Sequence, residues 1–398
     1  MPRVFLPSSR PALFLGVSAL LTSALVLSAC TSSPTKVGEP ATTTTVAPTS
    51  AAMVTPPPFT ATGMPAALEA IIKPLYYGGT VPASTSAALV LHKRKPVSAT
   101  SSVVAQGSVS SFKGVPIAVV TSGSDVTLAV AAPTWRVVGG WWPSVGVAAP
   151  SLGGARRVLL VGSDARPGQS VTKSRADSLH IVGVDGGGGG GVLGIARDSY
   201  VNLATGGKGK INSALALGGP AALQRTVVSA TGVPLEGYVI TGFDGFKRII
   251  DGIGGLPMNV PVTVVGAGAD VTIRAGANVL TGRAALAYGR QRHTVAGGDI
   301  GRSANQGLLI MAAGAFTKLL GPAKLPGILH TAAPNVTTNL SAEQVLTFAA
   351  GAFITSPNKV HNRVAAGTFG WTPDRQSIIL FDANARRYFA DIRNGNLS

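Results

Sequence analysis

Apolar and polar positions alternate in a regular order from about residue 156 to the end of the chain. Apolar runs with the length of buried strands lie at residues 157–161, 178–184, 192–196, 238–241 and 378–381. Segments with helix start and stop signals lie at residues 221–230, 245–253, 281–288 and 302–320. A capping box, Ser341-Ala-Glu-Gln344, opens a further helix. This interleaving predicts an α/β fold, an α-β-α sandwich in which helices cover both faces of a central mixed sheet.

The segment at residues 63–150 has a different pattern. Its apolar runs are short, and glycine, serine and lysine interrupt them, which predicts a small β-rich accessory segment. Examples of these runs are residues 87–91, 117–121 and 126–131. Few acidic side chains are available there for acid–base or metal chemistry. From Thr31 to Pro150 they are Glu39, Glu69 and Asp125. Three tryptophans, Trp135, Trp141 and Trp142, could form a sugar-stacking surface, but packing at a domain junction is the favoured interpretation.

The N-terminus has the layout of a secretory signal. Arg3 and Arg10 precede an uncharged apolar run over residues 11–29. The run leads into Leu-Ser-Ala-Cys30, which resembles the bacterial lipobox, and Cys30 is the only cysteine of the protein. We therefore expect residues 1–29 to be a signal peptide and Cys30 to be lipidated, so that the chain is anchored in a membrane. A single transmembrane anchor is the alternative.

Both interpretations place the rest of the chain on the extracytoplasmic face of the cell membrane, next to the cell wall. Residues 30–62 are rich in Thr, Pro and Ala and are expected to form an extended linker. The formal net charge of +17 would suit nucleic acid, anionic lipid or an anionic wall polymer. Export excludes nucleic acid as the partner. A single cysteine also excludes internal disulfides and a cysteine zinc cage.

Arginine and aspartate are concentrated in two blocks that lie far apart in the sequence, although only 12% of residues are charged. The first block contains Asp164, Arg166, Arg175, Asp177, Arg197 and Asp198, and the second contains Arg290, Arg292, Asp299, Arg302 and, further on, Gln306. Guanidinium groups bind phosphate oxygens through paired hydrogen bonds. Two close carboxylates can hold a hard divalent cation that also binds phosphate. The blocks therefore predict a site for a pyrophosphate and its metal.

The two blocks and the segments between them resemble the catalytic domain of the LytR–CpsA–Psr family. The matching runs include Leu-Leu-Val-Gly-Ser-Asp164-Ala-Arg166, Arg175-Ala-Asp177, Ile-Ala-Arg197-Asp198, Lys210-Ile-Asn-Ser, Gly242-Phe-Asp-Gly-Phe246, Asp251-Gly-Ile-Gly-Gly255, Arg290-Gln-Arg292 and Asp299-Ile-Gly-Arg302. Each run is weak alone, but the set is specific in this order and spacing. The resemblance implies a catalytic domain over residues 151–398.

Members of this family are membrane-tethered enzymes that transfer a glycopolymer from a polyprenyl pyrophosphate carrier to peptidoglycan through a phosphodiester link. By resemblance, Asp164 and Asp177 would hold Mg²⁺ (or Mn²⁺) on the pyrophosphate. The arginines that would bind its oxygens are Arg175, Arg197, Arg290, Arg292 and Arg302. Gln306 would add a hydrogen bond, and Arg166 is a weaker candidate. Asp299 would either orient the arginines or assist deprotonation of the acceptor hydroxyl. Apolar helices around Phe243, Phe246, Ile249, Ile250 and residues 308–312 could line a tunnel for the prenyl chain. Ordinary core packing is the favoured interpretation for any one of these residues.

Three positions depart from the usual pattern of the family. Ala176 stands where serine is usual, Ala196 where proline is usual, and Asn305 where many members carry arginine. The last departure removes a positive charge and could alter activity or substrate. Two other functions stay open: a pyrophosphatase that uses the same residues with water as nucleophile, and a non-catalytic lipoprotein whose arginines bind an anionic wall polymer.

Overall fold

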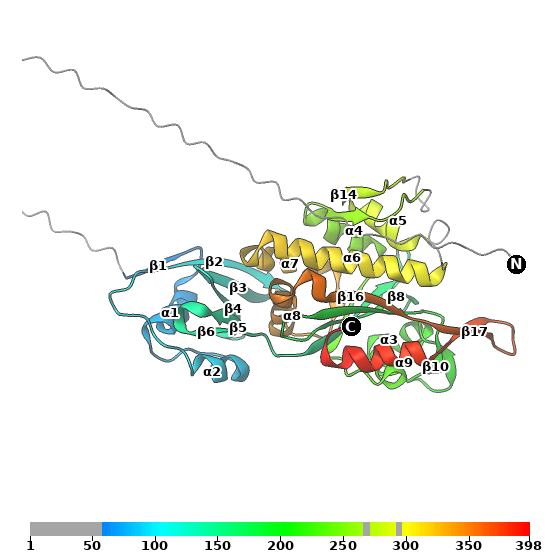
Figure 1. The fold of residues 1–398 in the computed structure, drawn as a ribbon, viewed down its shortest axis with the longest axis horizontal. Coiled ribbons are helices and arrows are strands. Elements are labelled where there is room, and N and C mark those ends of the chain that lie inside the picture. Colours follow the sequence, from blue (N-terminus) through cyan, green and yellow to red (C-terminus); the bar gives the residue numbers. More distant parts are fainter. Residues whose placement is uncertain (1–57, 266–270, 292–296) are drawn as a thin grey trace, which may run out of the picture. The chain divides into compact units, whose positions relative to one another are not determined.

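The computed structural model describes residues 58–265, 271–291 and 297–398 (Figure 1). All of them fall in one compact unit, Thr55–Ser398. The expected signal peptide, Cys30 and most of the expected linker lie outside the described residues, as does Arg292. Within the described part, no single helix is both long and apolar enough to cross a membrane. Among the described helices, only the pair Asp299–Leu320 and Pro322–Asn335, which is bent by 109°, would together have the length and apolar composition of a membrane span.

The centre of the fold is a six-stranded mixed sheet with the order β15-β12-β7-β8-β9-β16. Its strands are β7 (Arg156–Ser163), β8 (Ala176–Val184), β9 (Gly190–Ile195), β12 (Gly237–Thr241), β15 (Thr337–Thr338) and β16 (Val360–Ala365). The pairs β7–β12 and β9–β16 are parallel, and the other pairs are antiparallel. The predicted strands 157–161, 178–184, 192–196 and 238–241 are all present.

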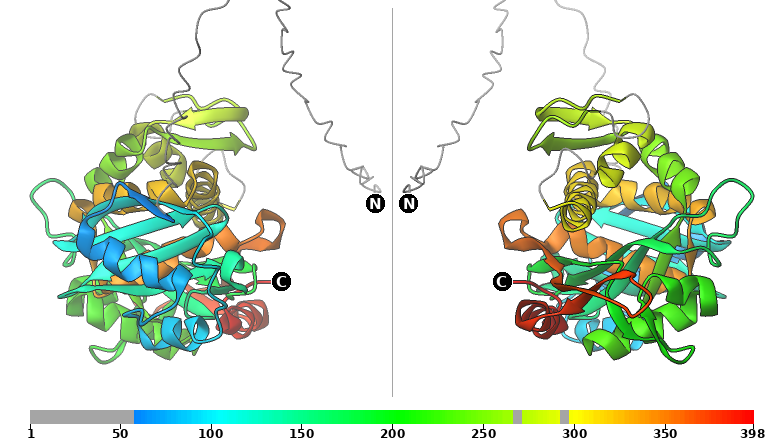
Figure 2. Two further views of the ribbon diagram at one scale, coloured as in Figure 1. Left: turned by 90° about the vertical axis from the view of Figure 1, so that its left-hand side faces the viewer. Right: turned by 90° about the vertical axis from the view of Figure 1, so that its right-hand side faces the viewer.

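Helices cover both faces of this sheet, as the sequence predicts (Figures 1 and 2). On one face α3 (Ser213–Thr231) and α9 (Ala383–Asp391) share a core with Leu179, Leu193 and Ile195. On the other face α6 (Asp299–Leu320) packs against β8, β9 and β16. The predicted helix at residues 221–230 is the second part of α3, which is interrupted at Gly219, where φ is 72°.

A further layer lies beside α6. It contains α4 (Phe243–Gly252), α5 (Gly282–Arg290) and the hairpin of β13 (Leu256–Val260) and β14 (Gly276–Leu280). Their apolar side chains form a core with Leu309 of α6. Thr281 caps α5 by accepting a hydrogen bond from the Ala284 N–H at 3.2 Å, as predicted. The predicted capping box is also present at the start of α8 (Ala342–Ile354).

The N-terminal segment folds into its own six-stranded sheet. The strands are β1 (Phe59–Thr62), β2 (Val103–Phe112), β3 (Val115–Ser122), β4 (Asp125–Ala131), β5 (Trp135–Trp142) and β6 (Val147–Ser151), in that order. Helices α1 (Ala66–Tyr77) and α2 (Thr85–Leu91) pack on one face, and α7 (Leu325–Ala332) and α8 pack on the other. The β-rich character is therefore confirmed, whereas the predicted domain boundaries stay predictions.

Two details of this segment bear on the sequence analysis. The apolar run 87–91 belongs to α2 and is not a strand, because Ser84 caps a helix there by accepting from the Ala87 N–H. Trp142 is fully buried and donates its indole N–H to the Thr127 hydroxyl at 2.7 Å. Trp135 and Trp141 are half-buried. Packing is thus the observed arrangement of these three tryptophans.

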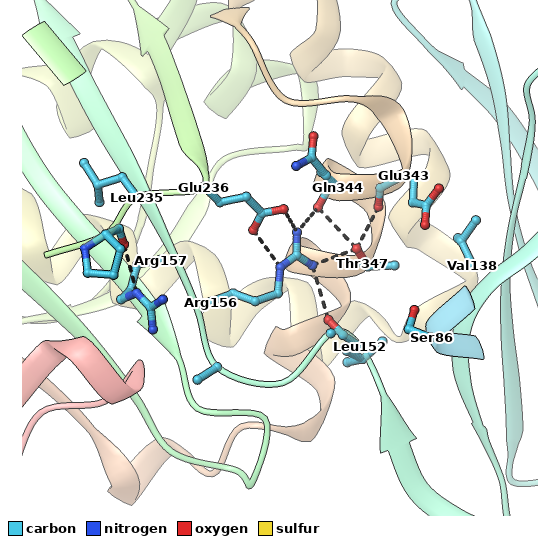
Figure 3. Close-up of a pocket in the computed structure, with 13 residues that line it drawn as sticks. Ser86, Val138, Leu152, Arg156, Arg157, Leu235, Glu236, Glu343, Gln344 and Thr347 are labelled. Atoms are coloured by element: carbon cyan, nitrogen blue, oxygen red, sulfur yellow. Dashed lines mark hydrogen bonds and ion pairs between the residues drawn. The ribbon is translucent and has the colours of Figure 1, made fainter. Parts of the chain in front are cut away.

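Arg156 joins the two sheets beside a cavity of about 460 Å³ (Figure 3). Its Nε and Nη2 atoms donate to both carboxylate oxygens of Glu236 at 2.7 and 2.6 Å, and Nη1 donates to the Thr347 hydroxyl at 2.7 Å. The guanidinium also lies over the ring of Phe348, 5.5 Å from its centroid. Arg156 is the first residue of β7, whereas Asp164 of the first charged block follows the last residue of that strand. The charge of Arg156 is also neutralised by Glu236. We therefore interpret this cavity as part of the packing between the two sheets and not as part of the charged site.

His180 and Gly194 fix how closely α6 approaches the central sheet. His180 of β8 is fully buried, and its Nε2 lies 3.0 Å from the carbonyl oxygen of Ser303 in α6. Its Nδ1 lies 3.1 Å from the Ser178 hydroxyl. A Cβ at position 194 would collide with the Ser303 hydroxyl and crowd His180 Nε2, so a larger residue there would require one of these side chains to move. Burial is the main cause that lowers the pKa of His180 to about 4.

The burial of His180 predicts a loss of stability in mild acid. Unfolded His180 takes up a proton near pH 6.5, but the folded form does so only near pH 4. The free energy of unfolding should therefore be fully retained above pH 6.5 and fall by up to about 3 kcal/mol as the pH decreases to 4. Urea denaturation of the wild type and of His180→Gln measures this. The variant should show a flatter profile, whereas His92→Gln, at an exposed position, should behave as the wild type. An unchanged slope in His180→Gln would contradict the assignment.

Candidate functional site

Four residues of the first charged block, Asp164, Arg166, Arg175 and Asp177, lie where β7 ends and β8 begins. Ser163 pairs with Ala176, but Gly162 pairs with Ser178, so that Asp177 is an extra residue in a β-bulge. The N–H of Asp164 donates to the carbonyl oxygen of Arg175 at 3.0 Å. The backbone therefore holds Asp164, Arg175 and Asp177 next to one another at this edge of the sheet. A bulge commonly redirects one side chain, and here it redirects a predicted metal ligand.

Arg197, also of the first block, contacts Asp177 of its own block and Asp299 of the second. It follows β9, whose carboxyl end lies at the same edge of the sheet as that of β7. Its Nη1 donates to Asp177 Oδ1 at 2.5 Å, and its Nε donates to Asp299 Oδ2 at 3.1 Å. Asp198 Oδ2 lies 3.8 Å from the same Nε. Burial lowers the pKa of the guanidinium, but the three carboxylates outweigh burial and raise it, so Arg197 stays charged.

The second block occupies the first turns of α6. Asp299 is in the first turn, where a carboxylate interacts favourably with the helix dipole. Arg302 is 5% exposed, and its Nη2 lies 3.6 Å from Asp299 Oδ2. One carboxylate oxygen of Asp299 therefore faces both Arg197 and Arg302. These contacts support the predicted role of Asp299 in orienting arginines, and its role in deprotonation stays a prediction.

Arg290 and Gln306 lie where α5 meets α6. Arg290 is the last residue of α5, and its guanidinium lies 4.8 Å from the ring centroid of Phe243. This cation–π contact orients an exposed positive charge. The side-chain N–H of Gln306 donates to the carbonyl oxygen of Gly289 at 3.0 Å, which fixes the end of α5. In this structure Gln306 thus contacts the backbone that precedes Arg290.

Lys210 is a member of the cluster that the sequence analysis did not single out. It ends β11 (Lys208–Lys210), which pairs with β10 (Tyr200–Asn202), and its Nζ lies 3.1 Å from Asp198 Oδ1. Its position in one of the matching sequence runs was the available signal. The contacting side chains now comprise Arg197, Lys210 and Arg302 with Asp177, Asp198 and Asp299, whose formal charges cancel. The exposed Arg175 adds positive charge two residues from Asp177, and the exposed Arg166 and Arg290 lie in the loop after β7 and at the end of α5.

The described residues contain no group of three or more His, Cys, Asp or Glu side chains that could hold a metal ion. Asp164 and Asp177 offer two carboxylates from neighbouring backbone positions. Mg²⁺ is commonly held by one or two carboxylates and completes its shell with substrate phosphate and water. Asp177 uses Oδ1 for Arg197, and its second oxygen can serve a cation. The donor set therefore fits Mg²⁺ or Mn²⁺ that arrives with a phosphate.

The three departures from the family pattern lie close to the cluster in sequence. The N–H of Ala196 donates to the carbonyl oxygen of Ala365 in β16 at 3.3 Å, a bond that the usual proline could not make. Ala176 is fully buried in the strand pair beside Asp177. Asn305 is only 5% exposed. Asn305 therefore lies on the buried side of α6. The positive charge that arginine carries in many members is thus missing from the protein interior and not from the exposed surface.

Comparisons with known proteins agree with this fold. The sequence model of the LytR_cpsA_psr family matches residues 146–389. The chain is 34% identical over 183 residues to the "Probable cell wall biosynthesis protein LcpB" of Corynebacterium glutamicum, which covers 43% of this chain and 42% of that protein. It is 35% identical over 178 residues to the "Polyisoprenyl-teichoic acid--peptidoglycan teichoic acid transferase TagV" of Bacillus subtilis, which covers 42% of this chain and 46% of TagV. The matched part is thus less than half of each relative.

The crystal structure of B. subtilis TagV matches with a TM-score of 0.53 and 28% identity, over 61% of this chain and 99% of that structure. The chain is thus an α/β protein, an α-β-α sandwich with arginines and aspartates gathered at one edge of its central sheet. Within that class, the chain belongs to the LytR–CpsA–Psr family, because the family model matches more than half of its residues. The expected family is therefore confirmed.

The central position of Arg197 predicts that its removal weakens the binding of pyrophosphate with Mg²⁺. Arg197→Ala leaves Asp177, Asp198 and Asp299 facing an incoming anion with one positive charge fewer. We expect the affinity to fall by about 10- to 100-fold, since hydrogen bonds to charged groups contribute about 1.5–3 kcal/mol. Arg197→Lys should recover part of the loss, because it keeps the charge but not the planar fork.

Isothermal titration calorimetry with pyrophosphate and Mg²⁺ measures this affinity. Arg225→Ala, at an exposed position on α3, is the matched control and should bind as the wild type does. Near-UV circular dichroism establishes that each variant keeps its packing. If Arg197→Ala binds as tightly as Arg225→Ala, Arg197 does not contribute to the anion site.

Proposed function

We propose that the protein is a cell-envelope transferase that moves a glycopolymer phosphate from a polyprenyl pyrophosphate carrier to a sugar hydroxyl of peptidoglycan. The observation that carries this proposal is the set of contacts that Arg197 makes with Asp177 and Asp299. These contacts unite the two charged blocks into one cationic site with carboxylates. Family membership and the printed function of TagV, transfer of teichoic acid to peptidoglycan, support the same conclusion.

The chemistry follows from the side chains of the cluster. Phosphoryl transfer requires positioning and charge stabilisation rather than a covalent protein intermediate. The exposed Arg175 and Arg290 would bind the phosphate oxygens, and Arg197, held by carboxylates on two elements, would keep a fixed orientation. Asp164 and Asp177 would hold the divalent cation, which neutralises phosphate charge when it is bound. These residues hold the donor in place while the acceptor attacks.

The proposed reaction is a nucleophilic displacement at phosphorus, in which one P–O bond forms and another breaks. The acceptor sugar oxygen forms a bond to the phosphorus that carries the glycopolymer. The bond from that phosphorus to the bridging oxygen breaks, and polyprenyl phosphate leaves. The hydroxyl proton passes to solvent or to a carboxylate of the cluster, for which Asp299 is the candidate. The arginines stabilise the charge that develops on the leaving phosphate.

Two other functions differ from this one in their products. A polyprenyl-pyrophosphate pyrophosphatase would release free polymer phosphate, since water would take the place of the acceptor. A wall-polymer-binding lipoprotein would bind the donor without turnover. The transferase is favoured because the relative that matches over 178 residues carries a transferase name.

The metal proposal predicts the loss of transfer when the cation or its ligand is removed. With the full mature chain, a polyprenyl-pyrophosphate-linked glycan and peptidoglycan oligosaccharides, the wild type should release polyprenyl phosphate and form the polymer–peptidoglycan conjugate. EDTA or Asp164→Asn should lower the rate at least about 100-fold, as expected when several kcal/mol of charge stabilisation are lost. Mass spectrometry of the products measures both outcomes.

Glu69→Gln, on α1 of the N-terminal sheet, is the matched carboxylate control and should keep the wild-type rate. Undiminished transfer in EDTA would remove the cation from the mechanism. Free polymer phosphate without conjugate would identify the pyrophosphatase, and donor binding without any product would identify the binding lipoprotein.

We further propose that Cys30 carries the membrane anchor and holds the protein on the extracytoplasmic face. The lipobox-like Leu-Ser-Ala-Cys30 and the preceding apolar run support this proposal. Protein extracted from membranes should have the mass of a chain that begins at Cys30 with attached acyl groups. Cys30→Ala should leave the chain unlipidated. An unmodified mature wild-type chain would contradict the anchor.

A further inference from the structure

A projecting hairpin next to the charged cluster exposes two aromatic side chains. The hairpin is formed by β17 (Gly367–Trp371) and β18 (Ser377–Phe381), and it follows β16 directly (Figure 1). Phe369 is 68% exposed and Trp371 is 70% exposed. The other three tryptophans of the chain are buried or half-buried. An indole exposed to this extent loses the usual stabilisation from burial, which indicates a binding role.

The two rings lie on one face of the hairpin, because residues two apart on a strand point to the same side. Trp371 stands opposite Ser377, and Phe369 stands opposite Ile379, which is 4% exposed. Serine is too small to cover the indole from across the strand pair. The hairpin therefore presents two adjacent aromatic surfaces. Phe369 has a bulky cross-strand neighbour, Ile379, whereas Trp371 faces only the small Ser377.

Hydrogen bonds tie the hairpin to the cluster. The N–H of Ile379 donates to the carbonyl oxygen of Asp198 at 3.0 Å, and Ser199 forms a parallel bridge with Ile379. At the base of the hairpin, Phe381 contacts Phe389 of α9 edge to face, with 4.9 Å between ring centroids. The segment that carries Arg197 and Asp198 is thus also the segment on which the hairpin rests.

The hairpin and the apolar layer of α4, α5 and α6 belong to opposite sides of the central sheet. Phe381 packs with the core of α3 and α9, whereas α6 packs on the other face with α4 and α5. In phosphoryl transfer the attacking and leaving oxygens lie roughly in line on opposite sides of phosphorus. A prenyl phosphate that leaves toward the apolar layer would place the incoming hydroxyl on the side of the hairpin.

We propose that Phe369 and Trp371 form a stacking platform for the sugar rings of the acceptor peptidoglycan strand. This inference rests on the proposed transferase function, and it adds the part of the protein that holds the acceptor. The negatively polarised face of an aromatic ring attracts the C–H groups of a pyranose ring. A platform beside Asp198 holds a neighbouring sugar of the strand while the reacting hydroxyl enters the cluster.

The turn of the hairpin favours a glycan over a membrane surface. Asp374 in this turn accepts hydrogen bonds from the Thr372 hydroxyl and, at 2.6 Å, from the side chain of Gln376. Arg375 is also in the turn. Insertion of the hairpin tip into a bilayer would bury these charged groups, which is costly. The aromatic side chains lie on the stem, where a polymer strand can pass across them.

The test is the affinity of the full mature chain for soluble, uncrosslinked peptidoglycan glycan strands. The double variant Phe369→Ala/Trp371→Ala should bind these strands at least about tenfold more weakly, because both stacking surfaces are removed. The single variant Trp371→Tyr, which keeps an aromatic ring at this position, should retain most of the wild-type affinity. Leu380→Ala, an exposed apolar position on the other face of the same hairpin, is the matched control and should bind as the wild type does. Quenching of tryptophan fluorescence and calorimetry measure the binding.

Three results separate this inference from the proposed function. Loss of glycan affinity in the double variant, with unchanged affinity for pyrophosphate and Mg²⁺, supports the platform even if no transfer is found. Transfer by the double variant with a wild-type KM for the acceptor would overturn the platform and leave the transferase intact. Binding of Cys30→Ala protein to phosphatidylglycerol vesicles that requires Trp371, while glycan binding does not, would assign the hairpin to the membrane and also overturn the proposal.

Discussion

The ion pairs of Arg197 are the interaction on which the candidate site depends. They connect a carboxylate from the bulge at the start of β8 to one from the first turn of α6, residues that are 122 positions apart in the sequence. A half-buried guanidinium must be compensated by negative charge, and the three aspartates provide it. The same pairing makes the formal charges of the contacting side chains cancel, so that any net positive charge of the candidate site comes from its exposed arginines.

This arrangement requires that α6 lies at a fixed height above the sheet. His180 and Gly194 set that height: the histidine contacts a helix carbonyl, and the glycine removes the side chain that would collide with Ser303. A change of about 1 Å in the position of α6 would separate Asp299 from Arg197, because a charge-assisted hydrogen bond tolerates little lengthening. Packing in the interior therefore controls the geometry of a site at the edge of the sheet.

The N-terminal sheet adjoins the start of β7, at the opposite end of that strand from the charged cluster, and contributes to the hydrophobic core. Its core includes Leu325, Leu329 and Leu346 from α7 and α8, and Arg156 joins it to the central sheet at the end of β7 opposite Asp164. A segment that shares a core in this way stabilises the rest of the chain rather than acting as a loosely attached module. The tryptophans of that sheet are used for packing, and the one that is exposed lies instead in the hairpin beside the cluster.

The chain's local patterns alone determined most strands and helices of the central domain, the capping box at Ser341 and the two charged blocks, because apolar periodicity and caps act between residues close in sequence. They did not distinguish the short helix at 87–91 from a strand, since a brief apolar run fits both. Only the folded chain brought Lys210 to Asp198, placed Arg290 over Phe243, buried Asn305 and left Trp371 exposed. Such pairings depend on how elements far apart in sequence pack together, and that packing is not recorded in any one stretch of residues.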